Sequence, residues 1–166
     1  MAASARYPPS EIAFSPPMPQ PVGNKGETKM VNWVLRGAVL LWALFFFMIG
    51  ARGLLDPASY SETFGFTISG VAINTLRADL SSFFLVSAGA AALGALVPSW
   101  VRALLVPAAL YGTALTGRLI GVAMGDPTNF GIVQGMIVEA LSVLLLTGSW
   151  WVLSRPVAAA APGEPG

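Results

Sequence analysis

The chain has 166 residues, of which 55% are hydrophobic and only 10% are charged, whereas soluble domains average about 25% charged residues. The net charge is +1, which leaves no polybasic surface to hold nucleic acid. Cysteine and histidine are both absent from the sequence. Their absence excludes disulfides, thiolate nucleophiles, zinc–thiolate and iron–sulfur sites, imidazole haem ligands and histidine-based acid–base catalysis. These counts indicate a small integral membrane protein.

The two ends of the chain have compositions that do not build a core. Residues 1–30 are polar and rich in proline, so we predict a disordered or polyproline-like tail there. A plain solvated tail is the simpler interpretation, and a ligand for a proline-recognition module is the alternative. No apolar run begins within these residues, so they do not read as a secretory signal. Residues 154–166 are rich in Ala, Pro and Gly and are predicted to form a second disordered tail.

Four apolar stretches lie between the tails, at 31–54, 76–98, 101–124 and 132–153. Each has the roughly 20 residues needed to cross about 30 Å of hydrocarbon. Backbone polar groups must be satisfied inside a bilayer, so each stretch is predicted to be a helix. Residues 31–153 therefore predict an all-α, up-and-down bundle of four transmembrane helices. Small residues between Ser87 and Gly94 favour close helix packing in the second span.

The connection from 55 to 75 is long for a small bundle, and long loops often carry structure. Asp56 and Pro57 form a good helix start, because Asp can cap a helix and Pro is tolerated at its first position. We predict a short interfacial helix near 57–64 that ends at Gly65. Asp126 and Pro127 repeat this start after the third span.

Charge and tryptophan placement predict the orientation. The loop between spans three and four holds Asp126 but no Lys or Arg. Positive residues favour the cytoplasm, so both termini are predicted to be cytoplasmic. The basic residues on the side of the termini are Lys25, Lys29, Arg36, Arg102 and Arg155. The tryptophans predicted to form an interfacial belt on that side are Trp33, Trp100, Trp150 and Trp151.

The third span contains Gly117, Gly121 and Gly125 at intervals of four. This spacing predicts a packing surface, either within the chain or between copies of it. A homo-oligomer or a membrane-protein partner could therefore use this glycine ridge.

Two charged residues enter the membrane from the same side. By the helical rise, Arg118 lies roughly 9 Å from the outer end of span three and Glu139 roughly 10 Å from the outer start of span four. Antiparallel neighbours would bring the two side chains level, so we predict an Arg118–Glu139 ion pair. It is either a structural clasp that sets helix register or part of a ligand or ion site.

Other polar residues gather at the same outer half. Arg77 and Asp79 begin span two, Arg52 ends span one, and Tyr111 shares a helical stripe with Arg118. This convergence predicts a polar pocket that opens to the outer side. The predicted ligand-binding residues are Arg77, Asp79, Tyr111, Arg118 and Glu139. The simpler alternatives are that Asp79 complements a helix dipole, Arg77 reaches the head groups and Tyr111 is a packed aromatic residue.

Short segments resemble a known family. They are GLLDP at 53–57, LRAD at 76–79 and GRLIG at 117–121, together with Glu139. The pattern resembles small four-helix bacterial membrane proteins of unknown function (DUF4345-like), which are distantly similar to DoxX-like proteins. The resemblance implies a four-span protein of the bacterial inner membrane. DoxX-like relatives are linked to redox accessory roles or to assisting other membrane proteins.

Three functional hypotheses follow. The first is a non-enzymatic accessory or ligand-binding bundle, in which the outer pocket holds an anionic or zwitterionic group on Arg77 and Arg118. Asp79 and Glu139 balance those charges, and the apolar tail of a lipid or quinone-like molecule lies between helices. The alternative is a proton-coupled small transporter that acts as an oligomer and uses Glu139. A membrane enzyme is the least favoured, because no nucleophile elbow, phosphate-binding glycine loop or metal-ligand spacing occurs. We therefore predict no catalytic residue, no cofactor and no metal site.

Overall fold

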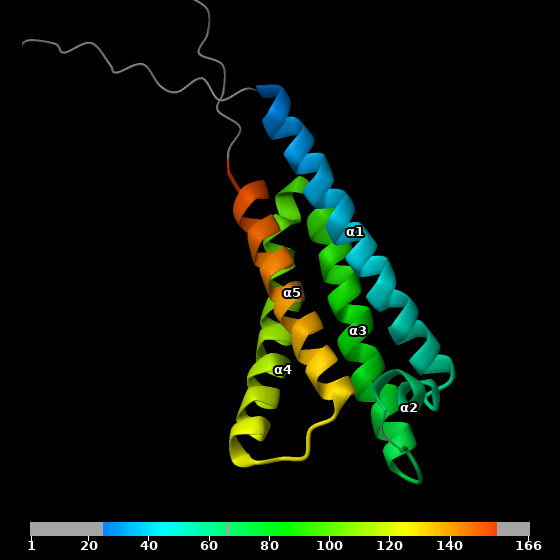
Figure 1. Ribbon diagram of the computed structural model, residues 1–166. Coiled ribbons are helices and arrows are strands. Elements are labelled where there is room, and N and C mark those ends of the chain that lie inside the picture. The colour runs from blue at the N-terminus through cyan, green and yellow to red at the C-terminus, as the bar shows by residue number, and fades with distance from the viewer. Residues whose placement is uncertain (1–24, 66, 156–166) are drawn as a thin grey trace, which may run out of the picture.

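The computed structural model describes residues 25–65 and 67–155. These residues form five α-helices and one 3₁₀ helix, and no strand occurs among them. The elements are α1 (Lys25–Leu55), α2 (Ser59–Phe64), α3 (Ala72–Leu96), η1 (Pro98–Leu104), α4 (Leu105–Met124) and α5 (Phe130–Leu153). Four segments are long and apolar enough to cross a membrane, and they form the predicted all-α bundle (Figure 1). The third of them combines η1 with α4.

The first helix begins earlier than predicted. α1 starts at Lys25, so residues 25–30 belong to the helix and not to the proline-rich tail. No proline interrupts these residues, and Glu27 lies in the first turn, where a negative charge complements the helix dipole. The remainder of the predicted tails, 1–24 and 156–166, lies outside the described residues. The predicted C-terminal boundary agrees with the structure, because α5 ends at Leu153.

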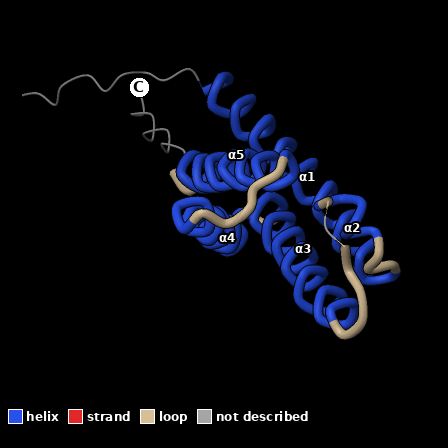
Figure 2. The backbone as a smooth tube through the Cα atoms, turned by 60° about the horizontal axis from the view of Figure 1, so that its bottom comes forward, coloured by secondary structure: helices blue, strands red, loops and turns tan. Residues whose placement is uncertain are grey.

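The helices pack in two antiparallel pairs. α1 lies along α3, α4 lies along α5, and α3 also contacts η1 and α4 (Figures 1 and 2). The described ends of the chain lie at one end of the bundle, and α2 and the α4–α5 loop lie at the other (Figure 1). We call these the terminal end and the loop end. The predicted tryptophan belt belongs to segments at the terminal end, namely the start of α1, η1 and the end of α5.

Two buried clusters form the core. The cluster nearer the terminal end is made of small and aliphatic side chains: Val39, Ala43, Ala91, Ala95, Val101, Leu104, Ala108 and Leu146. The cluster nearer the loop end is aromatic and consists of Phe46, Tyr60, Phe84 and Tyr111. The interior therefore changes from closely packed small residues to large rings along the bundle axis.

Glycines permit the closest helix contacts. A Cβ atom on Gly50 of α1 would lie 2.9 Å from Cβ of Phe84 on α3, and one on Gly94 of α3 would lie 2.8 Å from Cγ of Leu104. Real Cβ contacts are almost never this short, so neither position accepts a side chain without movement. The close packing predicted from the small residues of α3 is present in the structure.

The outer surface is apolar. On α1 the exposed side chains include Leu41, Leu44, Phe45 and Met48. In water such a surface would be unfavourable, whereas in a bilayer it faces hydrocarbon. The exterior is therefore that expected of a multi-pass membrane protein.

The short helix predicted near 57–64 is α2. The backbone N–H of Ala58 donates to Oδ1 of Asp56 at 3.2 Å, and Gly65 ends the helix in a left-handed conformation with φ of 70°. The second predicted helix start at Asp126 is wrong. Asn129 caps α5 instead, because its Oδ1 accepts the N–H of Ile132 at 2.9 Å. The chain thus runs three residues further as loop before it turns into α5.

The glycine ridge is not a uniform packing surface within the chain. A Cβ atom on Gly121 would lie 2.7 Å from Oδ2 of Asp126, whereas one on Gly117 would have no atom within 4 Å. Gly125 has φ of 85° and caps the end of α4. The three glycines therefore have different roles, and association between copies through them stays a prediction.

Candidate functional site

The ion pair predicted between spans three and four is present. Nε of Arg118 on α4 donates to Oε1 of Glu139 on α5 at 2.8 Å. The Glu139 side chain is 9% exposed and that of Arg118 is 35% exposed. The equal depth of the two residues on antiparallel helices brings the charges together, as the helical rise predicts.

The ion pair lies at a cavity of about 500 Å³ that all five α-helices help to form. Its polar lining consists of Tyr111, Arg118, Asn129 and Glu139. The large apolar side chains on its wall are Phe46, Phe64, Leu76, Leu80, Phe83, Phe84, Ile132 and Val138. Because Phe64 of α2 and Asn129 before α5 are among the lining residues, the cavity lies in the half of the bundle at the loop end. We call it the aromatic cavity.

Two buried polar atoms of this lining have no hydrogen-bond partner in the described part of the chain. They are the hydroxyl oxygen of Tyr111 and Oε2 of Glu139. Buried polar atoms are nearly always hydrogen-bonded in native proteins, so each orphan atom requires an explanation. The Tyr111 hydroxyl can donate a hydrogen bond, and Oε2 of the Glu139 carboxylate can accept one.

Aromatic contacts hold the Tyr111 ring in place. Its centroid lies 5.2 Å from that of Trp42 and 5.0 Å from those of Phe46 and Phe83. The contacts with Trp42 and Phe46 are edge-to-face, a favourable arrangement for aromatic quadrupoles. These rings come from α1 and α3, and their packing fixes the direction of the phenol.

Trp42 and Ser142 form a second polar link that the sequence interpretation missed. The indole N–H of Trp42 on α1 donates to Oγ of Ser142 on α5 at 2.9 Å, and Ser142 donates to the carbonyl of Val138 at 2.7 Å. The available signal was a tryptophan in the middle of an apolar span, since a buried indole N–H needs an acceptor. This link ties α1 to the helix that carries Glu139.

Arg77 and Asp79 are not part of the aromatic cavity. Both side chains are exposed, and neither is among its lining residues. Leu76 and Leu80 of the same helix line it instead, which leaves the residues between them on other faces of α3. Nη1 of Arg77 donates to the carbonyl of Leu54 at 3.2 Å.

Arg52 also lies apart from the ion pair. Its Nη2 donates to Oε2 of Glu62 at 2.7 Å, in an exposed ion pair that links α1 to α2. Of the five predicted ligand-binding residues, the structure brings Tyr111, Arg118 and Glu139 to one cavity and leaves Arg77 and Asp79 outside it.

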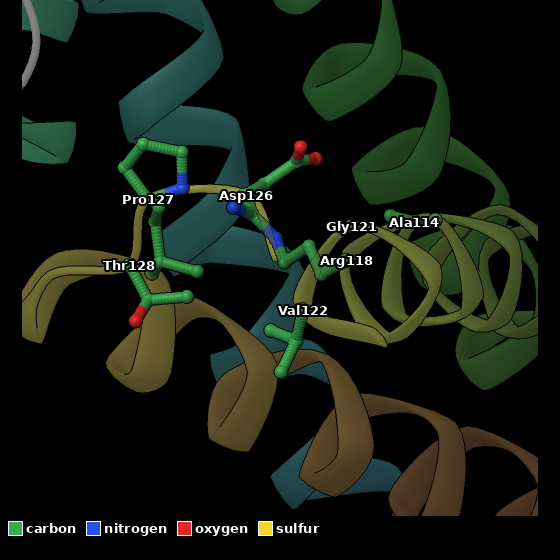
Figure 3. A pocket seen from close by; sticks show the side chains of 9 residues that line it. Ala114, Arg118, Gly121, Val122, Asp126, Pro127 and Thr128 are labelled. Atoms are coloured by element: carbon green, nitrogen blue, oxygen red, sulfur yellow. The ribbon is translucent and has the colours of Figure 1, made fainter. Parts of the chain in front are cut away.

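A second hollow of about 360 Å³ lies on the other side of Arg118. Figure 3 shows its lining by Arg118 and Val122 of α4 and by Asp126, Pro127 and Thr128 of the loop. Ala114, Arg118 and Ile132 line both this hollow and the aromatic cavity. The guanidinium therefore stands between the two, which accounts for its partial exposure.

The chain matches no protein-family model, no curated protein and no solved structure. The resemblance to the DUF4345-like and DoxX-like proteins therefore stays a prediction. Within residues 25–65 and 67–155, no group of three acidic side chains could hold a metal ion. The chemistry that these residues offer is hydrogen bonding and charge recognition beside an apolar chamber.

Proposed function

We propose that this four-helix membrane protein binds a small amphipathic molecule, such as a lipid or a quinone-like compound, in the aromatic cavity. The polar end of the ligand meets Tyr111, Arg118 and Glu139, and its apolar body lies against the aromatic wall. In this proposal the protein is a non-enzymatic binding or accessory protein of a bacterial inner membrane, with the cavity in the outer half.

The size and lining of the cavity support this proposal. Small-molecule sites are typically 300–1,000 Å³ and apolar, with a few polar groups that orient the ligand. The aromatic cavity has about 500 Å³ and a wall of aromatic and aliphatic side chains. Its few polar groups include one ion pair, which would hold the polar end of a ligand in one place.

The observation that carries the proposal is the pair of orphan atoms. A ligand group with a hydrogen-bond acceptor beside a donor would satisfy both the Tyr111 hydroxyl and Oε2 of Glu139. A hydroxyl group or a carbonyl–hydroxyl pair has this chemistry. A purely apolar ligand would leave both atoms unsatisfied.

The test compares two neighbouring residues of α4. Ala114 lines the cavity, whereas Thr113 is exposed on the outer surface. The full chain and its variants are purified in mild detergent, and the co-purifying small molecules are extracted and measured by mass spectrometry. Ala114→Leu fills the cavity and is expected to lower the retained molecule severalfold, while Thr113→Leu retains it. Equal retention by both variants, or no retained molecule in the wild type, would overturn the proposal.

Proton-coupled transport is the second candidate, because Glu139 presents to the aromatic cavity a buried carboxylate oxygen that has no hydrogen-bond partner in the described part of the chain. Such a carboxylate can take up and release a proton when the ion pair opens. Transport would be favoured if protons enter the lumen of proteoliposomes that contain the wild-type protein but not of those that contain Glu139→Gln. Proton flux that survives Glu139→Gln would exclude it.

A further inference from the structure

A groove of about 410 Å³ lies at the terminal end of the bundle, far from the aromatic cavity along the same helices. α1 contributes Lys29, Asn32, Trp33, Arg36 and Leu40, and the end of α3 contributes Leu96. We call it the terminal groove. None of the functional residues discussed above belongs to it.

One face of α1 forms the floor of the terminal groove. Lys29, Asn32, Arg36 and Leu40 are spaced by three and four residues and therefore lie on one face of the helix. The face spans about 16 Å along the axis. Along that length the face changes from polar to apolar: Lys29 and Asn32 come first, Arg36 follows, and Leu40 is last.

Arg36 is held at the groove by the neighbouring helix. Its guanidinium donates to the backbone carbonyl of Ala95. That carbonyl belongs to the last turn of α3, where carbonyls lack helical partners and a cation complements the helix dipole. One N–H is used in this contact, and the charge stays at the groove.

Asn32 provides an unsatisfied acceptor. Its side-chain oxygen is buried and has no hydrogen-bond partner in the described part of the chain. Lys29 is exposed. A ligand that brings both a negative charge and a hydroxyl group would meet the two cations and this oxygen. No acidic residue of the described chain lines the groove.

The length of α1 places the groove at the level of the lipid head groups. α1 has 31 residues, whereas about 20 suffice to cross the hydrocarbon. Residues between Gly37 and Ala51 carry no charge, so they occupy the apolar interior. The turn that holds Lys29 and Asn32 then extends into the interface, and the exposed ring of Trp33 lies there as interfacial tryptophans do.

We propose that the terminal groove binds an anionic phospholipid with a hydroxyl-bearing head group, the class of phosphatidylglycerol. The phosphate lies between Lys29 and Arg36, and a glycerol hydroxyl donates to Asn32. One acyl chain follows α1 past Leu40 and the exposed Leu96. Basic pockets between helices at a membrane surface bind anionic lipids by this combination of charge and apolar contact. The site is independent of the aromatic cavity.

Native mass spectrometry of the full chain in detergent tests this proposal, with phosphatidylglycerol and phosphatidylcholine of identical acyl chains as probes. The wild type is expected to retain phosphatidylglycerol preferentially. Lys29→Gln removes one cation and is expected to weaken phosphatidylglycerol binding about fivefold, with phosphatidylcholine unchanged. Asn32→Asp has almost the same shape but adds a negative charge, and it is expected to weaken binding at least as much.

Arg102→Gln is the matched control, because Arg102 is an exposed cation of η1 that does not line the groove. It is expected to bind phosphatidylglycerol as the wild type does. Equal retention of both lipids by the wild type, or equal losses in Lys29→Gln and Arg102→Gln, would overturn the proposal. Displacement of the lipid by equimolar glycerol 3-phosphate would also overturn it, because the groove would then recognise a free phosphate ester.

Discussion

Arg118 or Glu139 alone would be unfavourable inside a membrane, whereas the two together form a neutral pair. A charged residue at the centre of a membrane helix costs about 2.5–3.5 kcal/mol on insertion scales. Their contact of 2.8 Å neutralises both charges, and the partial exposure of Arg118 leaves part of the guanidinium open to the second hollow, the one lined by Asp126 and Pro127. The pair can therefore hold α4 against α5 and still present polar atoms to a ligand.

A double-mutant cycle separates the effect of each charge on stability from the coupling between the two charges. Glu139→Gln leaves an uncompensated Arg118 charge, so we expect it to lower stability by about 2 kcal/mol. Arg118→Gln leaves Glu139 uncompensated and is expected to have an effect of similar size. The double variant Arg118→Gln with Glu139→Gln should recover part of the loss, because neither charge then remains. Thermal unfolding in detergent measures all four proteins, and strictly additive losses would contradict the coupling.

The Tyr111 hydroxyl can be removed without changing the packing of its ring. Its hydroxyl has no partner in the described part of the chain, so Tyr111→Phe removes a polar atom without breaking a hydrogen bond. We expect the unfolding temperature of the ligand-free protein to stay the same or rise. The retained small molecule should nevertheless decrease. A clear loss of stability in Tyr111→Phe would show that the hydroxyl has a structural partner.

At the scale of the elements, two aromatic residues of α2, Tyr60 and Phe64, pack against the bundle, and the Phe64 ring stacks on Phe84 of α3 with the centroids 6.0 Å apart. The hydroxyls of Tyr60 on α2 and Ser81 on α3 are 2.8 Å apart, and both side chains are buried. The Tyr60 ring lies directly over Gly53 of α1, where a Cβ atom would overlap it. An exposed ion pair between Arg52 and Glu62 adds little to this contact.

Gly53→Ala should therefore displace α2. The added methyl group meets the Tyr60 ring, and we expect a loss of about 2 kcal/mol or more from overpacking. Gly37→Ala is the matched control on the same helix, since a Cβ atom there has no neighbour within 4 Å. Circular dichroism melts of the two variants test this difference, and equal melting temperatures would contradict it.

Tyr60→Phe tests the hydrogen bond and its pH dependence. Burial raises the pKa of the Tyr60 phenol above its ordinary value of 10.0, and the bond to Ser81 lowers it less. When α2 leaves the bundle, the phenol loses its proton at a lower pH than in the packed state. Packing of α2 is therefore expected to weaken as pH rises above 10.

At neutral pH we expect Tyr60→Phe to lower stability by about 1 kcal/mol, because Ser81 loses its partner. Above pH 10 its stability should fall less steeply than that of the wild type. Melts between pH 8 and pH 11 measure both effects. Parallel pH profiles for the two proteins would contradict the assignment to Tyr60.

At the scale of the whole molecule, the bundle has two chemically different ends. The loop end carries the aromatic cavity, and the terminal end carries the groove formed by α1 and α3. A cluster of buried small and aliphatic residues lies along the bundle between them. We therefore expect the two proposed sites to be occupied independently, each from its own leaflet.

The absence of native cysteine makes the orientation directly measurable. Ala58→Cys and Thr128→Cys place thiols at exposed positions of the loop end, and Ser99→Cys places one at the terminal end. A membrane-impermeant thiol reagent is expected to label the first two from outside the cell and the third only after permeabilisation. Labelling of all three from the same side would contradict the four-span arrangement.

Hydropathy along the sequence determined the number of spans, their approximate limits and the depth of each charged residue. The depth of a residue within a span depends only on its distance in sequence from the end of that span, because a helix advances about 1.5 Å per residue. For that reason the Arg118–Glu139 contact could be predicted. The cap at Asn129 could not, since Asp126 with Pro127 offers a helix start of equal local quality.

Only the tertiary structure decided which side of each helix faces inward. A membrane helix is apolar all round, so its sequence carries little amphipathic signal for its rotation about its own axis. Packing against neighbours turned Leu76 and Leu80 of α3 into the aromatic cavity and left Arg77 and Asp79 outside. The same packing joined Trp42 to Ser142 across the bundle. The depth of a residue along a span therefore follows from the sequence, whereas the direction in which its side chain points is set by the packing of the helices.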